Sequence, residues 1–476
     1  MAEKTKKVGL FGLIAMVFGS MIGGGIFNLP QNMANHSALG PVIIAWIITG
    51  VGMLFLALTF KTLSDVRPDI KTGIYAYAKE GFGRYVGFNT AWGYWISSAV
   101  GNVAFAVMLN DALGYFWPVL LHHGWQTMIF GTVVIWIMNF IVLNGIKSST
   151  SINTVTTVAK IVALIVIVVI MVVFFNMESF SFDFWGKSLD IGTIGEQVKS
   201  PMLITLWCFI GIEGAVVISG RAKKPSDVGK ATVIGFLLAL GLYILISLLA
   251  YGMMHQPQLA KLEDPSAGYL LQGAVGNWGI DLVNLAVIVS VGGAWVAWTI
   301  IVAEVPYAAA KEGVFPKIFS RENNKKAPDA ALYITSLLMT IMMAVVVSAN
   351  NVYIFAVDTA GVMILPAYIL SAGFLWKESG NSKILKGKRQ QRKKALIIGI
   401  FATVYSAWLI FAAGPGYILL SILFYTIGIP VFYNMHKQDI KQGKQVFKGF
   451  EKIIALVFIL AAITAVYLLV TGKISY

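Results

Sequence analysis

The chain carries little charge for its length. Of its 476 residues only 12% are Asp, Glu, Lys or Arg, whereas 58% are hydrophobic, and the mean hydropathy is +0.77. A soluble protein of this size needs far more polar surface, and apolar stretches near 20 residues recur along the whole sequence. These values exclude a soluble globular protein and predict an all-α protein that crosses a membrane many times.

Cysteine and the usual catalytic motifs are also scarce. Cys208 is the one cysteine, which excludes a disulfide framework and a thiolate metal cluster. The sequence contains no HExxH, GxSxG or P-loop motif, and the pair His122 and His123 has no carboxylate nearby. We therefore expect no enzymatic activity, no cofactor and no bound metal.

The basic residues are distributed very unevenly. If the N-terminus is cytoplasmic, 31 of the 36 Lys and Arg fall in cytoplasmic segments, four fall outside, and Lys160 lies within a span. This asymmetry follows the positive-inside rule and predicts a multi-pass protein of the plasma or inner membrane with a cytoplasmic N-terminus. The basic run at 386–394 is then a loop facing anionic lipid, not a nucleic-acid site. We expect the bilayer and small molecules as partners, and the sequence leaves a homodimer open.

Apolar segments divide the chain into thirteen candidate spans. Residues 1–376 are expected to form a ten-helix transporter core with halves at about 8–175 and 200–376, followed at 377–476 by the basic loop and three further helices. The spans lie at roughly 8–34, 40–60, 85–117, 125–143, 151–175, 200–219, 229–254, 279–310, 329–348, 352–376, 395–413, 415–435 and 451–471.

Two of these spans contain glycines where a helix should be strongest. The first carries SMIGGGIF, with Gly23, Gly24 and Gly25 in sequence, and the sixth carries Gly211 and Gly214 around Glu213. Each glycine weakens a helix interior by about 1 kcal/mol. Spans five apart cross the membrane in opposite directions, so paired interruptions indicate the central site of an inverted-repeat transporter. The alternative is close helix packing through small residues.

A helix break of this kind has the polarity of an α-amino acid. Freed backbone N–H groups at the start of a half-helix can hold a carboxylate, and freed carbonyls at the end of the other half suit an ammonium group. Glycine is required because no Cβ then blocks the approach of the ligand. The two breaks are therefore predicted to form an amino-acid clamp.

Five ionisable residues lie at or near membrane depth: Asp111, Lys160, Glu213, Glu304 and Asp358. A charge there costs about 3 kcal/mol on insertion scales and usually marks a pathway or a pair. We assign Glu213 to a gate or to proton coupling, and Lys160 to coupling, with Glu304 as a candidate partner. The alternatives are a hydrogen-bonded packing role for Glu213 and snorkelling for Lys160.

Several long motifs resemble the amino acid–polyamine–organocation transporters, and most closely the basic amino acid/polyamine antiporters such as bacterial arginine/ornithine exchangers. The resemblance spans about residues 8–471 and implies the five-plus-five inverted-repeat fold with helices 1 and 6 broken and spans 11 to 13 appended. The motifs are GSMIGGGIFNLPQNMA (19–34), YWISSAVGN (94–102), LWCFIGIEGAVVISGRAKKPSDVGKA (206–231) and WTIIVAEVPYAAAKEGVFP (298–316).

The resemblance implies roles for individual residues. Tyr94 would be an inner gate, Trp207 would stack on the substrate and close the outer side, and Trp298 would be a middle gate, with Glu213 as a further gating residue. The substrate site would comprise Ile22, Gly23, Gly24, Gly25, Asn102, Trp207, Cys208, Ile210, Gly211 and Trp298.

Two positions depart from the family pattern. Gly24 stands where many arginine exchangers have serine, and Glu304 where arginine/agmatine exchangers have an uncharged amide. We predict an antiporter that exchanges an external cationic amino acid for its metabolic product, first arginine for ornithine. The alternatives are histidine/histamine or another amino acid/amine pair, and proton-coupled uptake. A membrane sensor would need a large soluble domain, and the loops are too short to supply one.

Overall fold

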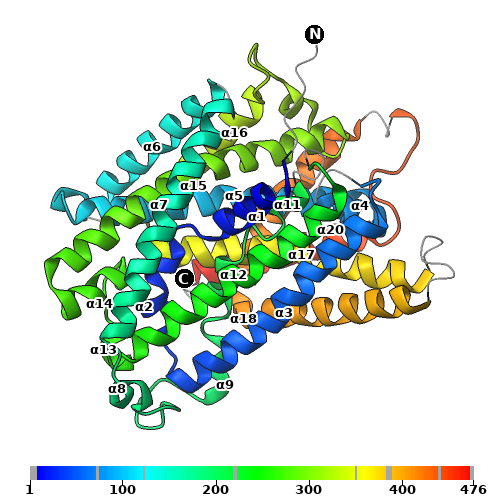
Figure 1. Ribbon diagram of the computed structural model, residues 1–476. Helices are drawn as coiled ribbons and strands as arrows, with labels where there is room; N and C mark the ends of the chain where they lie inside the picture. Colours follow the sequence, from blue (N-terminus) through cyan, green and yellow to red (C-terminus); the bar gives the residue numbers. More distant parts are fainter. Residues whose placement is uncertain are drawn as a thin grey trace.

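The computed structural model describes residues 8–70, 74–121, 124–144, 146–217, 222–348, 351–381, 389–437 and 441–471 (Figure 1). Within these ranges the chain is helical apart from turns and one isolated parallel bridge between Val8 and Ala222. The elements are α1 (Leu10–Met21), η1 (Gly25–Asn28), α2 (Leu29–Ala34), α3 (Leu39–Val66), α4 (Ile74–Phe82), α5 (Arg84–Gly114), η2 (Pro118–Leu121), α6 (Trp125–Leu143), α7 (Ile146–Val173), α8 (Met177–Ser181), α9 (Ile194–Lys199), α10 (Met202–Cys208), α11 (Gly214–Val217), α12 (Pro225–Tyr251), α13 (Gln256–Leu259), α14 (Ser266–Val275), α15 (Asn277–Lys311), η4 (Lys317–Ser320), α16 (Asp329–Val346), α17 (Val352–Asn381), α18 (Arg389–Met435) and α20 (Glu451–Val470).

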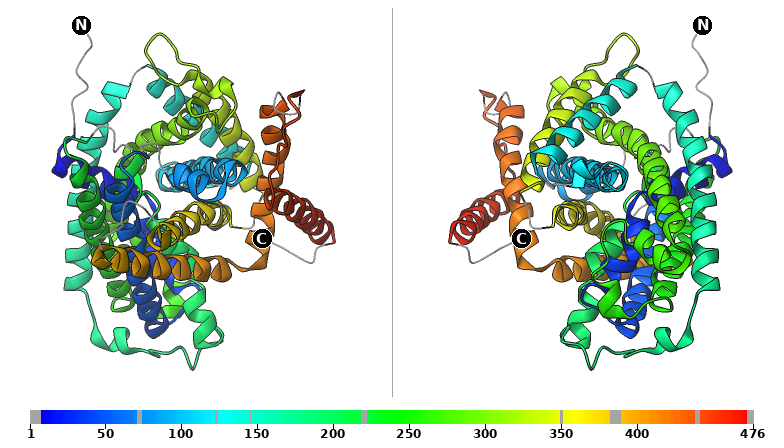
Figure 2. Two further views of the ribbon diagram at one scale, coloured as in Figure 1. Left: turned by 90° about the vertical axis from the view of Figure 1, so that its right-hand side faces the viewer. Right: turned by 90° about the vertical axis from the view of Figure 1, so that its left-hand side faces the viewer.

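Ten of the described helices are long and apolar enough to cross a membrane, and the bent pair Leu10–Met21 and Gly25–Ala34 makes an eleventh. The prediction of an all-α, multi-pass membrane protein is therefore confirmed. In this count α18 is a single helix, although Gly414 at φ 77° and the following Pro415 interrupt it. Proline cannot donate the helical hydrogen bond at that point, and the chain turns there (Figure 2).

The centre of the bundle is formed by α5 and α17, which pack against each other and against α15 and α18. In α5, 94% of the most apolar window is buried, whereas the value for α20 is 17%. Figure 2 shows α20 at the edge of the molecule. Because α5 is surrounded by protein, it tolerates more polar side chains than the lipid-facing helices and is the least apolar of the ten spans.

The last helix is tied to the central one by a carboxylate. Glu451, at the start of α20, accepts hydrogen bonds from the backbone N–H of Tyr85 (3.0 Å) and of Lys448 (2.8 Å). Gly83, the residue before α5, has φ 107°, and a Cβ on it would lie 2.8 Å from Glu451 Oε1. Glycine is therefore needed both for the backbone conformation and for the approach of the carboxylate, which satisfies a free N–H in the first turn of α5.

Candidate functional site

Two helices are interrupted in the middle of the bundle, where α1 and α11 lie close together (Figure 1). The first interruption runs from Ile22 to Gly24, between α1 and η1, and the flanking segments are bent by 44°. The second runs from Phe209 to Glu213, between α10 and α11. There Gly211 has φ 108°, a conformation that side-chain-bearing residues rarely adopt.

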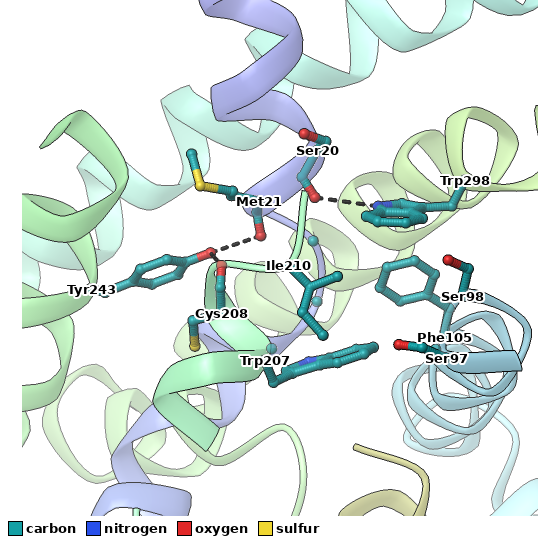
Figure 3. A pocket seen from close by; sticks show the side chains of 14 residues that line it. Ser20, Met21, Ser97, Ser98, Phe105, Trp207, Cys208, Ile210, Tyr243 and Trp298 are labelled. Atoms are coloured by element: carbon teal, nitrogen blue, oxygen red, sulfur yellow. Dashed lines mark hydrogen bonds between the residues drawn. The ribbon is translucent and has the colours of Figure 1, made fainter. Parts of the chain in front are cut away.

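The two interruptions are joined to each other directly. Ser20 Oγ donates to the carbonyl of Gly211 (3.1 Å). A Cβ on Gly211 would lie only 2.9 Å from Ser20 Oγ. Tyr243, on α12, places its hydroxyl 2.7 Å from the carbonyl of Met21 and 2.8 Å from the carbonyl of Cys208. These are the last residues of α1 and α10, so a single hydroxyl holds both helix ends (Figure 3).

A cavity with about 440 Å³ of empty space lies between the interruptions. None of the lining residues described carries a charge, so the site offers aromatic faces, hydroxyls and backbone groups. Those residues are Ser20, Met21, Gly23, Gly24, Gly25, Ser97, Ser98, Gly101, Phe105, Trp207, Cys208, Ile210, Tyr243 and Trp298 (Figure 3).

Aromatic side chains from four elements, α5, α10, α12 and α15, line this cavity (Figure 3). The Trp207 ring fits between two glycines, because a Cβ on Gly25 would lie 3.0 Å from its Nε1 and a Cβ on Gly101 3.0 Å from its Cη2. Phe105 lies beside Trp207, with ring centroids 6.2 Å apart. Trp298 Nε1 donates to the carbonyl of Ser20 (3.2 Å). The glycines thus make room for the aromatic walls as well as for a ligand.

The triple glycine also leaves donors unused. In the described part of the chain, no hydrogen bond is donated by the N–H groups of Gly24 and Gly25. A Cβ on Gly24 would overlap Met108 Sδ and lie 2.7 Å from Val291 Cγ2, which explains why a larger residue is not found there. The cavity therefore has free N–H groups at one end and aromatic faces around them.

Glu213 lies outside this cavity and holds three elements together. Its carboxylate accepts hydrogen bonds from the hydroxyls of Tyr94 on α5 (2.7 Å) and Tyr368 on α17 (2.9 Å), and from the N–H of Gly211 (3.3 Å). Its side chain is fully buried. Three donors around one carboxyl group satisfy its buried oxygens and offset part of the cost of burying it.

Lys160, on α7, is also buried and binds the end of α1. It is 1% exposed, and its Nζ donates to the carbonyls of Gly19 (3.0 Å) and Ile22 (2.6 Å). These carbonyls lie at the C-terminal end of α1, where the helix dipole favours a cation. The Lys160 side chain thus links α7 to the end of α1 through two hydrogen bonds.

The expected site residues therefore separate into two groups. The cavity is lined by Gly23, Gly24, Gly25, Trp207, Cys208, Ile210 and Trp298. Of the others, Ile22 and Gly211 act through backbone groups, Tyr94 and Glu213 bind each other, and Glu304 lies half-buried on α15.

Asn102 is not among the residues that line the cavity. It is 1% exposed, it follows the cavity residue Gly101, and within the described residues neither its Nδ2 nor its Oδ1 has a hydrogen-bond partner. Buried amides are normally satisfied. Unlike Asn89 and Asn110 on the same helix, whose amide nitrogens donate hydrogen bonds, Asn102 has both polar side-chain atoms unused among the described residues.

Seven cavity residues were not anticipated from the sequence: Ser97, Ser98, Phe105 and Gly101 on α5, Tyr243 on α12, and Ser20 and Met21 at the end of α1. The first three follow a helical spacing with Gly101 and so share one face of α5. Tyr243 carries a hydroxyl group within an apolar span. A hydroxyl at that depth needs a hydrogen-bond partner, and this requirement was the sequence signal that could have identified Tyr243.

Comparison with known proteins agrees with this architecture. The family model described as amino acid permease matches residues 8–416. A protein of Chlamydia pneumoniae named arginine/agmatine antiporter is 45% identical over 481 residues, covering 99% of each chain. One of the same name from Chlamydia caviae is 46% identical over 479 residues, covering 99% of this chain and 98% of its own.

A solved structure shows the fold independently. The crystal structure of MhsT in complex with L-phenylalanine aligns with a TM-score of 0.56 at 16% identity, covering 89% of this chain and 100% of that one. The match to the permease model extends over most of the chain, and the full-length relatives are well above the identity that establishes common family membership. The chain therefore belongs to the amino acid permease family of the amino acid–polyamine–organocation superfamily.

Proposed function

We propose that the chain is an antiporter that imports arginine in exchange for agmatine, the amine formed when arginine loses its carboxyl group. The observation that carries this proposal is the uncharged cavity between the two helix interruptions, which combines free N–H groups with aromatic faces. The names of the full-length chlamydial relatives support the same pair of substrates.

The cavity suits both ends of arginine. The carboxylate is held by the N–H groups of Gly24 and Gly25, and the guanidinium stacks on Trp207 or Trp298. Asn102 contributes the hydrogen bonds that its buried amide lacks in the protein itself. Agmatine keeps the guanidinium and loses the carboxylate, so the aromatic contacts are the ones that the two substrates share.

Transport follows from alternating access around this cavity. We assign the five-plus-five inverted repeat to residues 1–376, with the interrupted first and sixth spans at its centre, and thirteen spans in all with a cytoplasmic N-terminus. Trp207 closes the outer side, Trp298 lies between the gates, and Tyr94 with Glu213 closes the inner side. Lys160 couples the position of α1 to that of α7.

Counterflow in proteoliposomes tests this function. Vesicles loaded with agmatine should take up labelled external arginine, whereas empty vesicles should not. Trp207→Leu removes a cation–π contact worth about 2 kcal/mol and should weaken arginine binding about thirtyfold. Trp185→Leu, on a half-exposed tryptophan outside the cavity, is the matched control and should transport normally.

The same vesicles separate the alternatives. If vesicles loaded with ornithine or histamine exchange faster than vesicles loaded with agmatine, the proposed substrate pair is wrong. Uptake into empty vesicles driven by a pH gradient alone would instead establish proton-coupled uptake and overturn the antiport assignment. In that case Lys160 and Glu213 become the residues to test as proton carriers, with Glu304 as the candidate partner of Lys160.

A further inference from the structure

A second hollow lies on the outer surface of the bundle and shares no lining residue with the substrate cavity. It is a groove between α1, α7 and α12 with about 1160 Å³ of empty space. Its walls include Phe11 and Phe18 of α1, Ile161 and Ile165 of α7, and Leu238 and Leu245 of α12. One threonine is the only residue with a polar side chain among those described along it.

This groove faces the hydrocarbon of the membrane. Phe11 is 84% exposed, Ile165 56% and Leu238 54%. The most apolar windows of α7 and α12 have mean hydropathies of 2.9 and 2.7, among the highest of the ten spans. No water is present at that depth to fill a groove, so the occupant available to it is a lipid acyl chain.

The sequence keeps the groove open with a glycine. Gly241 lies within α12, where glycine is less favourable for a helix than alanine. A Cβ on Gly241 would meet no atom within 4 Å, so close packing of protein does not require glycine there. Any larger side chain at this position would instead project into the groove.

Two exposed lysines stand near one end of the groove. Lys223 and Lys224 precede α12, and the N–H of Lys223 donates to the carbonyl of Val8 (2.8 Å). The Lys223 side chain passes 3.8 Å from the position of a Cβ on Gly9, two residues before Phe11. Basic residues at such a site attract anionic headgroups, at about 1 kcal/mol each.

We propose that this groove binds an anionic phospholipid, with one acyl chain between α1 and α12 and the phosphate at Lys223 and Lys224. The cytoplasmic N-terminus proposed above places these two lysines, and so the phosphate, in the cytoplasmic leaflet. The lipid binding itself does not depend on the transport function.

The bound chain acts on the transport machinery through α12. The face of α12 opposite to the groove carries Tyr243, which holds the ends of α1 and α10. An acyl chain wedged beside α1 resists movement of α1 away from α12. Occupancy by the lipid therefore stabilises the arrangement in which both helix interruptions are held together.

Native mass spectrometry of the full-length protein in detergent tests the proposal. Wild-type protein is titrated with phosphatidylglycerol and with phosphatidylcholine. Two lysine contacts predict up to about thirtyfold tighter binding of phosphatidylglycerol. The double variant Lys223→Gln, Lys224→Gln should lose this preference and keep the weaker binding of both lipids.

Gly241→Phe fills the groove and should abolish the bound lipid, and the smaller Gly241→Leu should weaken binding in the same direction. Ile234→Phe is the matched control, because residue 234 lies two turns away on the same helix face but outside the groove. Wild-type binding by both Gly241 variants, an equal loss in Ile234→Phe, or equal affinity for the two lipids would each overturn the proposal. Counterflow on the same samples shows separately whether transport survives.

Discussion

Replacing Tyr243 by phenylalanine isolates one hydroxyl that joins the two helix interruptions. The hydroxyl has a single proton, so it donates to the carbonyl of Met21 or of Cys208 at any moment. Phenylalanine keeps the ring and its packing but leaves both buried carbonyls without this donor. The loss amounts to about 1 kcal/mol for one hydrogen bond and up to about 3 kcal/mol if a carbonyl remains dry.

The loss of this hydrogen bond destabilises the conformation in which both interruptions enclose the substrate. We expect arginine exchange in proteoliposomes to slow by about five- to 150-fold, the factor that corresponds to 1–3 kcal/mol. Tyr251→Phe provides the comparison, because Tyr251 lies on the same helix and its hydroxyl also donates to a backbone carbonyl, that of Ser37 (2.8 Å), away from the cavity. Exchange by Tyr243→Phe within twofold of wild type, or an equal defect in Tyr251→Phe, would refute the reasoning.

Three further perturbations test other parts of the site. Lys160→Met removes both hydrogen bonds to the end of α1 and should abolish exchange while the protein still folds; full exchange at every pH would exclude Lys160 from the mechanism. Gly24→Ser forces a Cβ onto Met108 and should weaken arginine binding in counterflow titrations, and adding Met108→Ala should restore part of it. Burial raises the pKa of Asp264, in the loop between α13 and α14, to about 7. The folded chain therefore keeps a proton that the unfolded chain loses near pH 4, so stability falls as pH rises from about 4 to 7. The melting temperature in detergent should drop between pH 5 and pH 8, and Asp264→Asn should flatten that drop.

The helix interruptions could be predicted because they depend on local chemistry. Helix α1 ends at Met21, next to the segment that contains the triple glycine, and Gly211 has the positive φ that its residue type allows. Local chemistry does not set where a helix resumes. The sixth span reads as one apolar stretch over 200–219, yet its first helical piece has only seven residues.

The walls of the cavity were predictable only in part. Trp207 and Trp298 are recognisable because they stand in long motifs, Trp207 beside the second interruption and Trp298 at the start of the motif on α15. Ser97 and Phe105 are not, since α5 is buried on almost every side and has no apolar stripe to distinguish its cavity face from its packing faces. Contacts such as Tyr94 with Glu213, 119 residues apart, arise from tertiary packing and leave no trace in local sequence.

The hydrogen bond between Glu451 and the start of α5 has a consequence for biosynthesis. The two partners are separated by 366 residues, so α5 enters the membrane long before its partner has been translated. A chain released early would carry an unsatisfied N–H next to Gly83, at the base of the helix that lines the substrate cavity. The start of the central helix thus gains this hydrogen bond only after the segment that carries α20 has been made.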